Sequence, residues 1–285
     1  MLKIPNDLSC YLNESGMGSA LKIQPINGGY TNQVYLLETE NRIKTFLKIN
    51  TIGCQSVFIR EADGLKALEN VNGIRVPQIY GYGEDWLLME FIEVSEPVES
   101  YWIDVGEGLA KIHLTTNEKF GFANDNFIGN NLQVNTWNTD GFKFFSEYRL
   151  GFQFELACQK GYIANDYCKL FDRLIFRLHD LIPVQPASLM HGDLWVGNLM
   201  CGPQGVPVFI DPAVYFGWAE ADLAMTTLFG QFEEDAYNAY ENVRPLTFGY
   251  RDRFDIYNLY HLLNHLNLFG VSYLTRVQNI LDKYS

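Results

Sequence analysis

The alternation of apolar and polar residues over the first ninety positions predicts a series of short β-strands. Runs rich in β-branched and aromatic residues lie between turn signals, which is the pattern of half-buried strands. These runs cover Leu21–Ile26, Gln33–Glu38, Ile43–Ile49, Gln78–Gly83 and Trp86–Phe91. They predict a small, mostly antiparallel sheet.

One helix is predicted to interrupt these strands. Across Gln55–Asn70, apolar residues and Glu61 recur at helical spacing on one face. The turn Val71-Asn-Gly73 then ends the helical pattern. The sheet is therefore expected to carry a single helix, inserted between its third and fourth strands.

After Glu93 the pattern changes to long helical periods, which predicts a mainly helical second half. We therefore expect an α+β chain with an N-terminal lobe, residues 1–93, and a larger C-terminal lobe, residues 94–285. The Asn- and Gly-rich stretch Phe120–Thr139 shows no period and is either an ordered excursion or a mobile loop. The predicted helices cover Val98–Leu114, Phe142–Lys160, Asp166–Ile182 and a set from Ala219 to the end.

Composition narrows the class of protein and of partner. With 285 residues, of which 47% are hydrophobic and 19% charged, the chain can bury one or two compact cores. Its formal net charge of −13 leaves no basic surplus to neutralise a nucleic acid or an anionic membrane. Neither nucleic acid nor membrane is expected as a partner.

The cysteines and the N-terminus indicate a cellular location. The five cysteines are irregularly spaced and contain no Cys-x-x-Cys pair, which favours a reducing compartment and no structural zinc. The N-terminal residues lack the cationic start and apolar core of a signal peptide, and no apolar run is long enough to span a bilayer. A soluble, cytoplasmic protein is expected.

The most informative segment is His191-Gly-Asp-Leu-Trp-Val-Gly-Asn198, which is followed by Val208-Phe-Ile-Asp211. Phosphoryl transfer to a hydroxyl needs a carboxylate at the acceptor, plus an amide and a second carboxylate that hold magnesium against the phosphates. Asp193 and Asn198 have the spacing of the first two groups (198 − 193 = 5), and Asp211 ends an apolar strand (211 − 198 = 13). We interpret Asp193 as the catalytic base and Asn198 and Asp211 as magnesium ligands, rather than as turn and helix-capping residues.

The first half of the chain supplies candidate ATP-binding residues. Lys48 lies on the third predicted strand, where an ammonium group can reach the α- and β-phosphates, and Glu61 lies on the helix that follows, so the two are expected to pair. Gly28 and Gly29, in the loop Asn27–Asn32, would let backbone N–H groups approach the phosphates, although an ordinary hairpin has the same pattern.

The end of the fifth predicted strand is the candidate hinge. Its residues Met89, Glu90 and Phe91 precede the helical half, where backbone groups would hydrogen-bond adenine. ATP and Mg²⁺ are therefore the expected cofactors.

These motifs resemble those of the fructosamine kinase and ketosamine-3-kinase family, within the wider aminoglycoside and choline kinase group. The resemblance covers nearly the whole chain. Antibiotic and choline kinases share the His-Gly-Asp and Asn positions but not Trp195, which is therefore the discriminating residue. The motifs that carry the resemblance are His191–Asn198, Asp211–Gly217, Glu220–Ala224, Gln133–Trp137 and Leu263–Gly270.

The resemblance implies a protein-kinase-like, two-lobed fold and a reaction. ATP would phosphorylate the 3-hydroxyl of a ketosamine, a fructosyl- or ribulosyl-amine on a protein lysine or a free amine. In the family the product then decomposes and releases the amine, which is deglycation. An indole at Trp195 would offer a flat apolar face to the sugar, and its alternative role is to anchor the loop by packing. The stretch Phe127–Trp137 is a candidate lining of the acceptor site.

Two positions depart from the family pattern. Val196 replaces a serine that many members have, which removes a hydroxyl near the acceptor, and the phosphate loop contains no cysteine, so redox-controlled dimerisation is not predicted. His113 and His191 are expected to brace the catalytic loop by hydrogen bonds, and Asp222 to cap it or bind its backbone.

Two other functions are compatible with the same motifs. One is a small-molecule kinase of the aminoglycoside or choline type, which an acceptor panel would separate. The other is a nucleotide-binding pseudokinase, which would bind ATP without acceptor-dependent turnover. The preferred sugar, the amine and the oligomeric state do not follow from the sequence.

Overall fold

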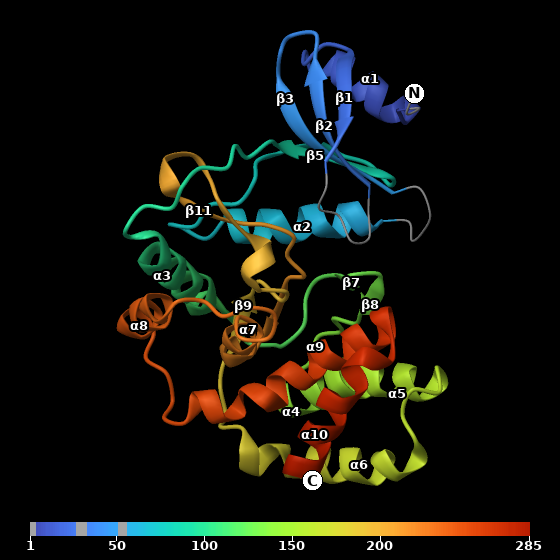
Figure 1. Ribbon diagram of the computed structural model, residues 1–285, viewed down its shortest axis with the longest axis vertical. Coiled ribbons are helices and arrows are strands. Elements are labelled where there is room, and N and C mark those ends of the chain that lie inside the picture. Colours follow the sequence, from blue (N-terminus) through green and yellow to red (C-terminus); the bar gives the residue numbers. More distant parts are fainter. Residues whose placement is uncertain (1–3, 27–32, 51–55) are drawn as a thin grey trace. The chain divides into compact units, whose positions relative to one another are not determined.

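The computed structural model describes residues 4–26, 33–50 and 56–285, and its chain forms two compact units (Figure 1). The first unit comprises Met1–Tyr101 and Leu199–Asp211, and the second comprises Trp102–Asn198 and Pro212–Ser285. The chain therefore returns to the first unit directly after the His191–Asn198 motif and leaves it again after Asp211.

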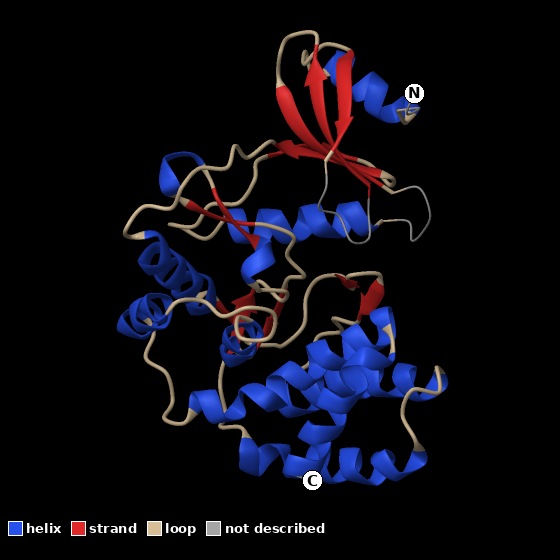
Figure 2. Cartoon of the chain, in the orientation of Figure 1, coloured by secondary structure: helices blue, strands red, loops and turns tan. Residues whose placement is uncertain are grey.

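The first unit is built on a five-stranded sheet in which every neighbouring pair of strands is antiparallel (Figure 2). The strand order is β1-β2-β3-β5-β4, so the predicted sheet and its strands are confirmed. The elements are α1 (Asn6–Glu14), β1 (Ala20–Pro25), β2 (Gln33–Thr39), β3 (Lys44–Ile49), α2 (Val57–Glu69), β4 (Ile79–Tyr82) and β5 (Trp86–Glu90).

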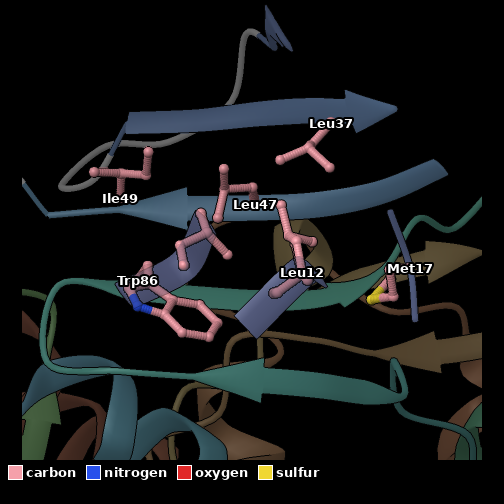
Figure 3. Close-up of a cluster of buried hydrophobic side chains, with 8 residues drawn as sticks. Leu12, Met17, Leu37, Leu47, Ile49 and Trp86 are labelled. Carbon is pink, nitrogen blue, oxygen red and sulfur yellow. The ribbon is translucent and has the colours of Figure 1, made fainter. Parts of the chain in front are cut away.

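Helix α1, which the sequence pattern did not predict, packs against one face of this sheet. Its Leu8 and Leu12 are buried in a cluster with Leu47, Trp86 and other apolar residues of the strands (Figure 3). The Trp86 Nε1–H also donates to a carboxylate oxygen of Asp7 at 2.6 Å. Side chains alternate between the two faces of a strand. Because Leu47 is buried on this face, the next residue on β3, Lys48, directs its side chain to the opposite face.

A hairpin from the second half of the sequence completes the first unit. Strands β10 (Leu199–Cys201) and β11 (Pro207–Phe209) pair antiparallel. The backbone N–H of Ser95 donates to the carbonyl of Cys201 at 3.0 Å, and the N–H of Phe209 donates to the carbonyl of Arg75 at 2.9 Å. These bonds join the hairpin to the segments on either side of β4 and β5.

The second unit is mainly helical, as predicted, and the predicted helical segments are present. It also contains a three-stranded sheet in the order β12-β9-β6 and the two-stranded hairpin β7–β8. Its helices are α3 (Tyr101–Leu114), α4 (Gly141–Phe144), α5 (Phe152–Gln159), α6 (Asn165–Leu181), α7 (Ala219–Met225), α8 (Glu234–Val243), α9 (Phe254–Phe269) and α10 (Leu274–Tyr284), and its strands are β6 (Thr116–Asn117), β7 (Asn126–Ile128), β8 (Asn131–Gln133), β9 (Ala187–Met190) and β12 (Tyr215–Gly217).

Two local features of the second unit add detail to the predicted pattern. The stretch Phe120–Thr139 is an ordered excursion, the first of the two predicted alternatives, and it contains the β7–β8 hairpin. The predicted helix Phe142–Lys160 is interrupted between α4 and α5 by a π-helical segment, Phe145–Gly151. No helix within the described ranges combines the length and the apolar character that crossing a bilayer requires.

Candidate active site

Lys48 is the centre of a buried charge cluster in the first unit. It lies on β3 in register with Val34 of β2 and Leu87 of β5, so its backbone is held by strands on both sides. Its Nζ lies 2.6 Å from Oε1 of Glu61 on α2 and 2.7 Å from Oδ1 of Asp211. The predicted Lys48–Glu61 pair is therefore present, and Asp211 joins it.

The electrostatics keep Lys48 cationic. Burial by itself lowers the pKa of Lys48, but the carboxylates of Asp211 and Glu61 more than offset this, and the net pKa is raised. Burial raises the pKa of Glu61, the ammonium of Lys48 opposes the rise, and the charge of Asp211 adds to it, so that the net pKa of Glu61 is raised. A fixed positive charge thus lies beside two acidic groups, which suits a residue that binds phosphate oxygens.

Asp211 lies at the point where the chain leaves β11. Its φ of 54° is in the left-handed region, where residues other than glycine are uncommon and often functional. Its side chain is 46% exposed, whereas those of Lys48 and Glu61 are 7% and 12% exposed. Of the three groups, Asp211 is the one most open to a ligand.

The catalytic motif forms a compact loop in the second unit. The Asn198 Nδ2–H donates to the Asp193 backbone carbonyl at 2.7 Å and to its carboxylate Oδ2 at 3.1 Å. The Asn198 N–H also donates to the carbonyl of Trp195 at 2.9 Å, within a 3₁₀ turn. These bonds fix the Asp193 carboxylate and leave Oδ1 of Asn198 as the amide atom suited to a metal.

Asp222 of α7 holds the start of this loop. Its two carboxylate oxygens accept hydrogen bonds from the backbone N–H groups of His191, at 2.6 Å, and Gly192, at 2.9 Å. Gly192 has a φ of +83°, and a Cβ atom there would lie 2.0 Å from the carbonyl oxygen of Ala213. Only glycine fits this position, and the expectation that Asp222 binds the loop backbone is confirmed.

A chain of buried groups supports Asp222 in turn. His113 Nε2 lies 3.2 Å from Oδ2 of Asp222, and His113 Nδ1 lies 2.8 Å from the hydroxyl of Tyr240, to which Arg244 also donates. Burial lowers the pKa of His113, so its ring is neutral and Nε2–H is the donor. Burial raises the pKa of Asp222, but the hydrogen bonds that it accepts from the His113 ring and the Gly192 N–H help to outweigh this, and the net pKa is lowered.

His113 and Asp222 are predicted from the sequence, whereas Tyr240 and Arg244 are not. Both of these residues lie on or just after α8, in a segment whose pattern signals only a helix with a buried face. A tyrosine at a core position of such a helix gives no sign in the sequence of where its hydroxyl is bonded.

The predicted metal ligands offer donors that fit magnesium. Asn198 can provide an amide oxygen and Asp211 a carboxylate, and Mg²⁺ in phosphotransferases is bound by one or two such protein groups together with phosphate oxygens and water. Across the described ranges no group of three His, Cys, Asp or Glu side chains could hold a metal ion.

Trp195 belongs to an aromatic cluster of the second unit. Its ring packs edge-to-face on Phe229, with ring centroids 6.1 Å apart. The Phe229 ring in turn packs on His265 and Tyr273, with ring centroids 4.4 Å and 6.3 Å apart. Gly197 accommodates the indole, because a Cβ there would lie 2.3 Å from it. The cluster is compatible with both predicted roles of Trp195, and Phe229 and Tyr273 are additions that the sequence did not single out.

The remaining predicted nucleotide residues are only partly described. Gly28 and Gly29 lie outside the described residues. Met89 and Glu90 end β5, and the Glu90 N–H donates to the carbonyl of Gln78 at 2.8 Å. This N–H is therefore already paired, with the residue that precedes β4.

Comparison with known proteins identifies similar chains. A model of the fructosamine kinase family matches residues 10–285. A protein named probable ketoamine kinase from Enterococcus faecium is 40% identical over 92% of this chain and 95% of its own length. A chloroplastic protein-ribulosamine 3-kinase from Oryza sativa subsp. japonica is 39% identical over 94% of this chain and 80% of its own length.

A solved structure shows the same fold. The crystal structure of a candidate fructosamine-3-kinase from Thermobifida fusca matches with a TM-score of 0.89 and 29% identity, over 98% of both chains. This likeness confirms the predicted kinase-like fold with its antiparallel-sheet and helical parts.

Proposed function

We propose that this chain, which belongs to the fructosamine kinase family, transfers the γ-phosphoryl group of ATP to the 3-hydroxyl group of ketosamines. The proposed acceptors are ribulosamines and fructosamines, on protein lysines or free amines. We further propose that Mg²⁺ is required and that the phosphorylated product releases the amine, so that the reaction reverses glycation.

One observation carries the phosphotransferase part of this proposal. Lys48 Nζ lies within 2.7 Å of carboxylate oxygens from both Glu61 and Asp211, which unites a phosphate-binding cation with a predicted metal ligand. Kinases use this combination to bind the α- and β-phosphates and the metal. If Lys48 and Glu61 formed an ion pair only to stabilise the fold, the half-exposed carboxylate of Asp211 would not be needed beside them.

In the proposed reaction the side chains mainly position and neutralise charge. Lys48 would bind phosphate oxygens, and Asn198 and Asp211 would hold Mg²⁺, which neutralises charge on the phosphates. Asp193, fixed by the amide of Asn198, would orient the acceptor hydroxyl and accept its proton. Asp222 would keep the loop in shape by holding the His191 and Gly192 amides.

Trp195 and its aromatic neighbours support the assignment of the acceptor class. An indole that is partly exposed beside Asp193 can stack on the C–H face of a sugar, and the edge-to-face contact with Phe229 fixes its plane. Val196, which is 41% exposed, lies next to it and replaces a hydroxyl with an apolar surface.

A cytoplasmic location remains part of the proposal and is supported by the free thiols of Cys10, Cys158, Cys168 and Cys201.

The test is ATP turnover with Mg²⁺ on paired ribulosyl-lysine and fructosyl-lysine derivatives. Choline and an aminoglycoside serve as alternative acceptors, and phosphorus NMR identifies the product. Asp193→Asn should lower kcat by about 10²–10⁴-fold, the usual size of a general-base contribution. The matched control is Asp255→Asn, which removes an exposed carboxylate bonded to Lys283 and should leave turnover unchanged.

Each outcome discriminates between the functions. A 3-phosphate on a ketosamine that depends on Asp193 supports the proposal, and the paired derivatives rank the sugars. Turnover on choline or the aminoglycoside alone would instead assign the chain to a neighbouring kinase class. ATP binding with no acceptor-dependent turnover would make it a pseudokinase, and a loss below about tenfold in Asp193→Asn would contradict the assigned base.

A further inference from the structure

The β7–β8 hairpin, labelled in Figure 1, and the segment just beyond it contain three buried polar side chains. Asn126 on β7, Gln133 on β8 and Asn135 just beyond are 5%, 1% and 1% exposed. A buried amide is costly unless its groups are hydrogen-bonded, so the partners of these three side chains show what the hairpin does.

Two of the amides hold the backbone that follows Asp211. The Gln133 Nε2–H donates to the carbonyl oxygen of Ala213 at 3.0 Å, and the Asn126 Nδ2–H donates to that of Val214 at 2.8 Å. Successive carbonyls in an irregular segment have no sheet or helix partners of their own. The hairpin therefore supplies the hydrogen bonds that secondary structure would otherwise provide.

The Ala213 backbone is in direct contact with the catalytic loop. Its N–H donates to the carbonyl of His191 at 2.9 Å, and its own carbonyl oxygen occupies the space that a Cβ on Gly192 would fill, 2.0 Å away. The Ala213 carbonyl is thus confined between Gly192 and the amide of Gln133. A shift of this carbonyl would move the loop that carries Asp193.

The amides also bond to one another. The Gln133 Nε2–H and the Asn135 Nδ2–H both donate to Oδ1 of Asn126, at 2.7 and 2.9 Å. The Tyr260 hydroxyl of α9 donates to Oε1 of Gln133 at 2.7 Å. Every amide in the set is therefore oriented by a neighbour, which fixes the two donors that reach the 213–214 backbone.

The side chain of Arg149 is a buried cation that donates hydrogen bonds to the far end of this amide network. Arg149 is fully buried and donates to Oδ1 of Asn135 and to the carbonyl of Val134, each at 2.6 Å. Its guanidinium carbon lies 3.9 Å from the centroid of the Tyr215 ring and 4.5 Å from that of Phe144. The Arg149 guanidinium thus donates to backbone carbonyl oxygens and to an amide oxygen, and its positive charge strengthens these hydrogen bonds.

The backbone at Arg149 is unusual as well. This residue lies on the π-helical segment Phe145–Gly151, and such segments are rare and frequent at functional sites. Eleven residues separate the end of β8 from the start of the π-helix (145 − 133 − 1 = 11), and the hydrogen bonds of Arg149 to Val134 and Asn135 connect the two segments.

We infer that Gln133 and Asn126 are positioning residues for the catalytic loop, acting through the Ala213–Val214 backbone in an amide network anchored on Arg149. This inference rests on the proposed kinase function. It gives the Phe127–Trp137 stretch a role in shaping the loop through its buried side chains, apart from any contact with the acceptor.

The test replaces Gln133 by methionine, which keeps the length of the side chain and removes its hydrogen bonds. Gln153→Met is the matched control, because Gln153 is also fully buried in the second unit but bonds to Asn264 and Asn267 of α9 and not to the Ala213 segment. Both variants are compared with the wild type by thermal unfolding, by kcat and KM, and by hydrogen exchange of the peptide that contains Ala213.

The expected result is a split between the two variants. Gln133→Met should lower kcat by about 10–100-fold, the cost of a displacement of roughly 1 Å, with the KM values for ATP and acceptor near those of the wild type. Its Ala213 peptide should exchange faster. Gln153→Met should lose comparable thermal stability while keeping both kcat and the exchange of that peptide.

Equal kcat losses in the two variants, or an unchanged exchange rate at Ala213 in Gln133→Met, would overturn the inference. If Gln133→Met does not fold, Tyr260→Phe removes only the hydroxyl that orients Gln133, and Tyr237→Phe removes a buried hydroxyl bonded to Thr226 as its control. Only the first should speed exchange at Ala213. Because exchange does not depend on the acceptor, this readout tests the network even if the wild type fails to phosphorylate ketosamines.

Discussion

Replacing Asp222 by asparagine tests how much of the active site depends on one buried carboxylate. The side chain receives hydrogen bonds from the N–H groups of His191 and Gly192 and from the ring of His113. An amide has one acceptor oxygen, which can replace Oδ2 and keep two of these bonds. Its NH₂ group would then face the Gly192 N–H, and two donors cannot pair.

The structure sets the size of the effect. A buried N–H left without a partner costs about 1–3 kcal/mol, and two bonds that lose their charge assistance weaken by about 1 kcal/mol each. The sum is roughly 3–5 kcal/mol, which should lower Tm by about 6–20 °C for a cooperative unit of this size. We also expect kcat to fall by about 10²-fold, because the loop that carries Asp193 would shift.

The pH dependence adds a signature. The folded pKa of Asp222 lies below its unfolded value, so the carboxylate stabilises the fold above about pH 4, and this contribution is lost as the pH falls through the folded pKa. The stability gap between the wild type and Asp222→Asn should therefore narrow in acid. Denaturant titrations from pH 7 to pH 3 would measure it, with Asp255→Asn as an exposed control. A variant with unchanged Tm and kcat would refute the reasoning.

Three other predictions follow from the same geometry. Lys48→Met should lower kcat by about 10²–10³-fold, because it removes the charge proposed to bind phosphate, and ATP turnover measures this loss. The pKa of Glu61 should rise further without the Lys48 cation, which titration of the carboxyl by NMR would show. His113→Phe should reduce the loss of stability between pH 6.5 and 5 by up to about 1.4 kcal/mol per pH unit, because the wild-type ring is neutral when folded but takes up a proton when unfolded; denaturant titration measures this slope. Protein shown by mass spectrometry to be unphosphorylated should be fully active, because only seven residues (219 − 211 − 1 = 7) separate Asp211 from Ala219 of α7, too few for a long activation loop.

The sequence predicted those parts of the site in which spacing and chemistry coincide. Lys48 and Glu61 lie on a strand and a helix whose patterns are regular, so their pairing could be expected. Asp193 and Asn198 share one short loop, and the hydrogen bond between them follows from that proximity. In each case local structure brings the groups together.

The parts that sequence analysis missed depend on contacts between distant segments. Helix α1 has only two fully buried leucines, Leu8 and Leu12, and its burial depends on a sheet face that forms elsewhere. Strands β7 and β8 have three residues each, too few for an alternating pattern to be recognised. Arg149 reads as an exposed helical charge, because the rings and amides that enclose it come from other elements.

The return of the chain to the first unit at Leu199–Asp211 has a consequence for biosynthesis. The β10–β11 hairpin provides the partners of Ser95 N–H and the Arg75 carbonyl, so the first unit lacks these bonds until the ribosome has made Asp211. Domains generally fold as units and in order from the N-terminus during translation, but here most of the second unit is synthesised before the first can be completed. A fragment that stops at Tyr101 should therefore remain incompletely folded, and Lys48, the proposed phosphate ligand, would acquire its second carboxylate only late in synthesis.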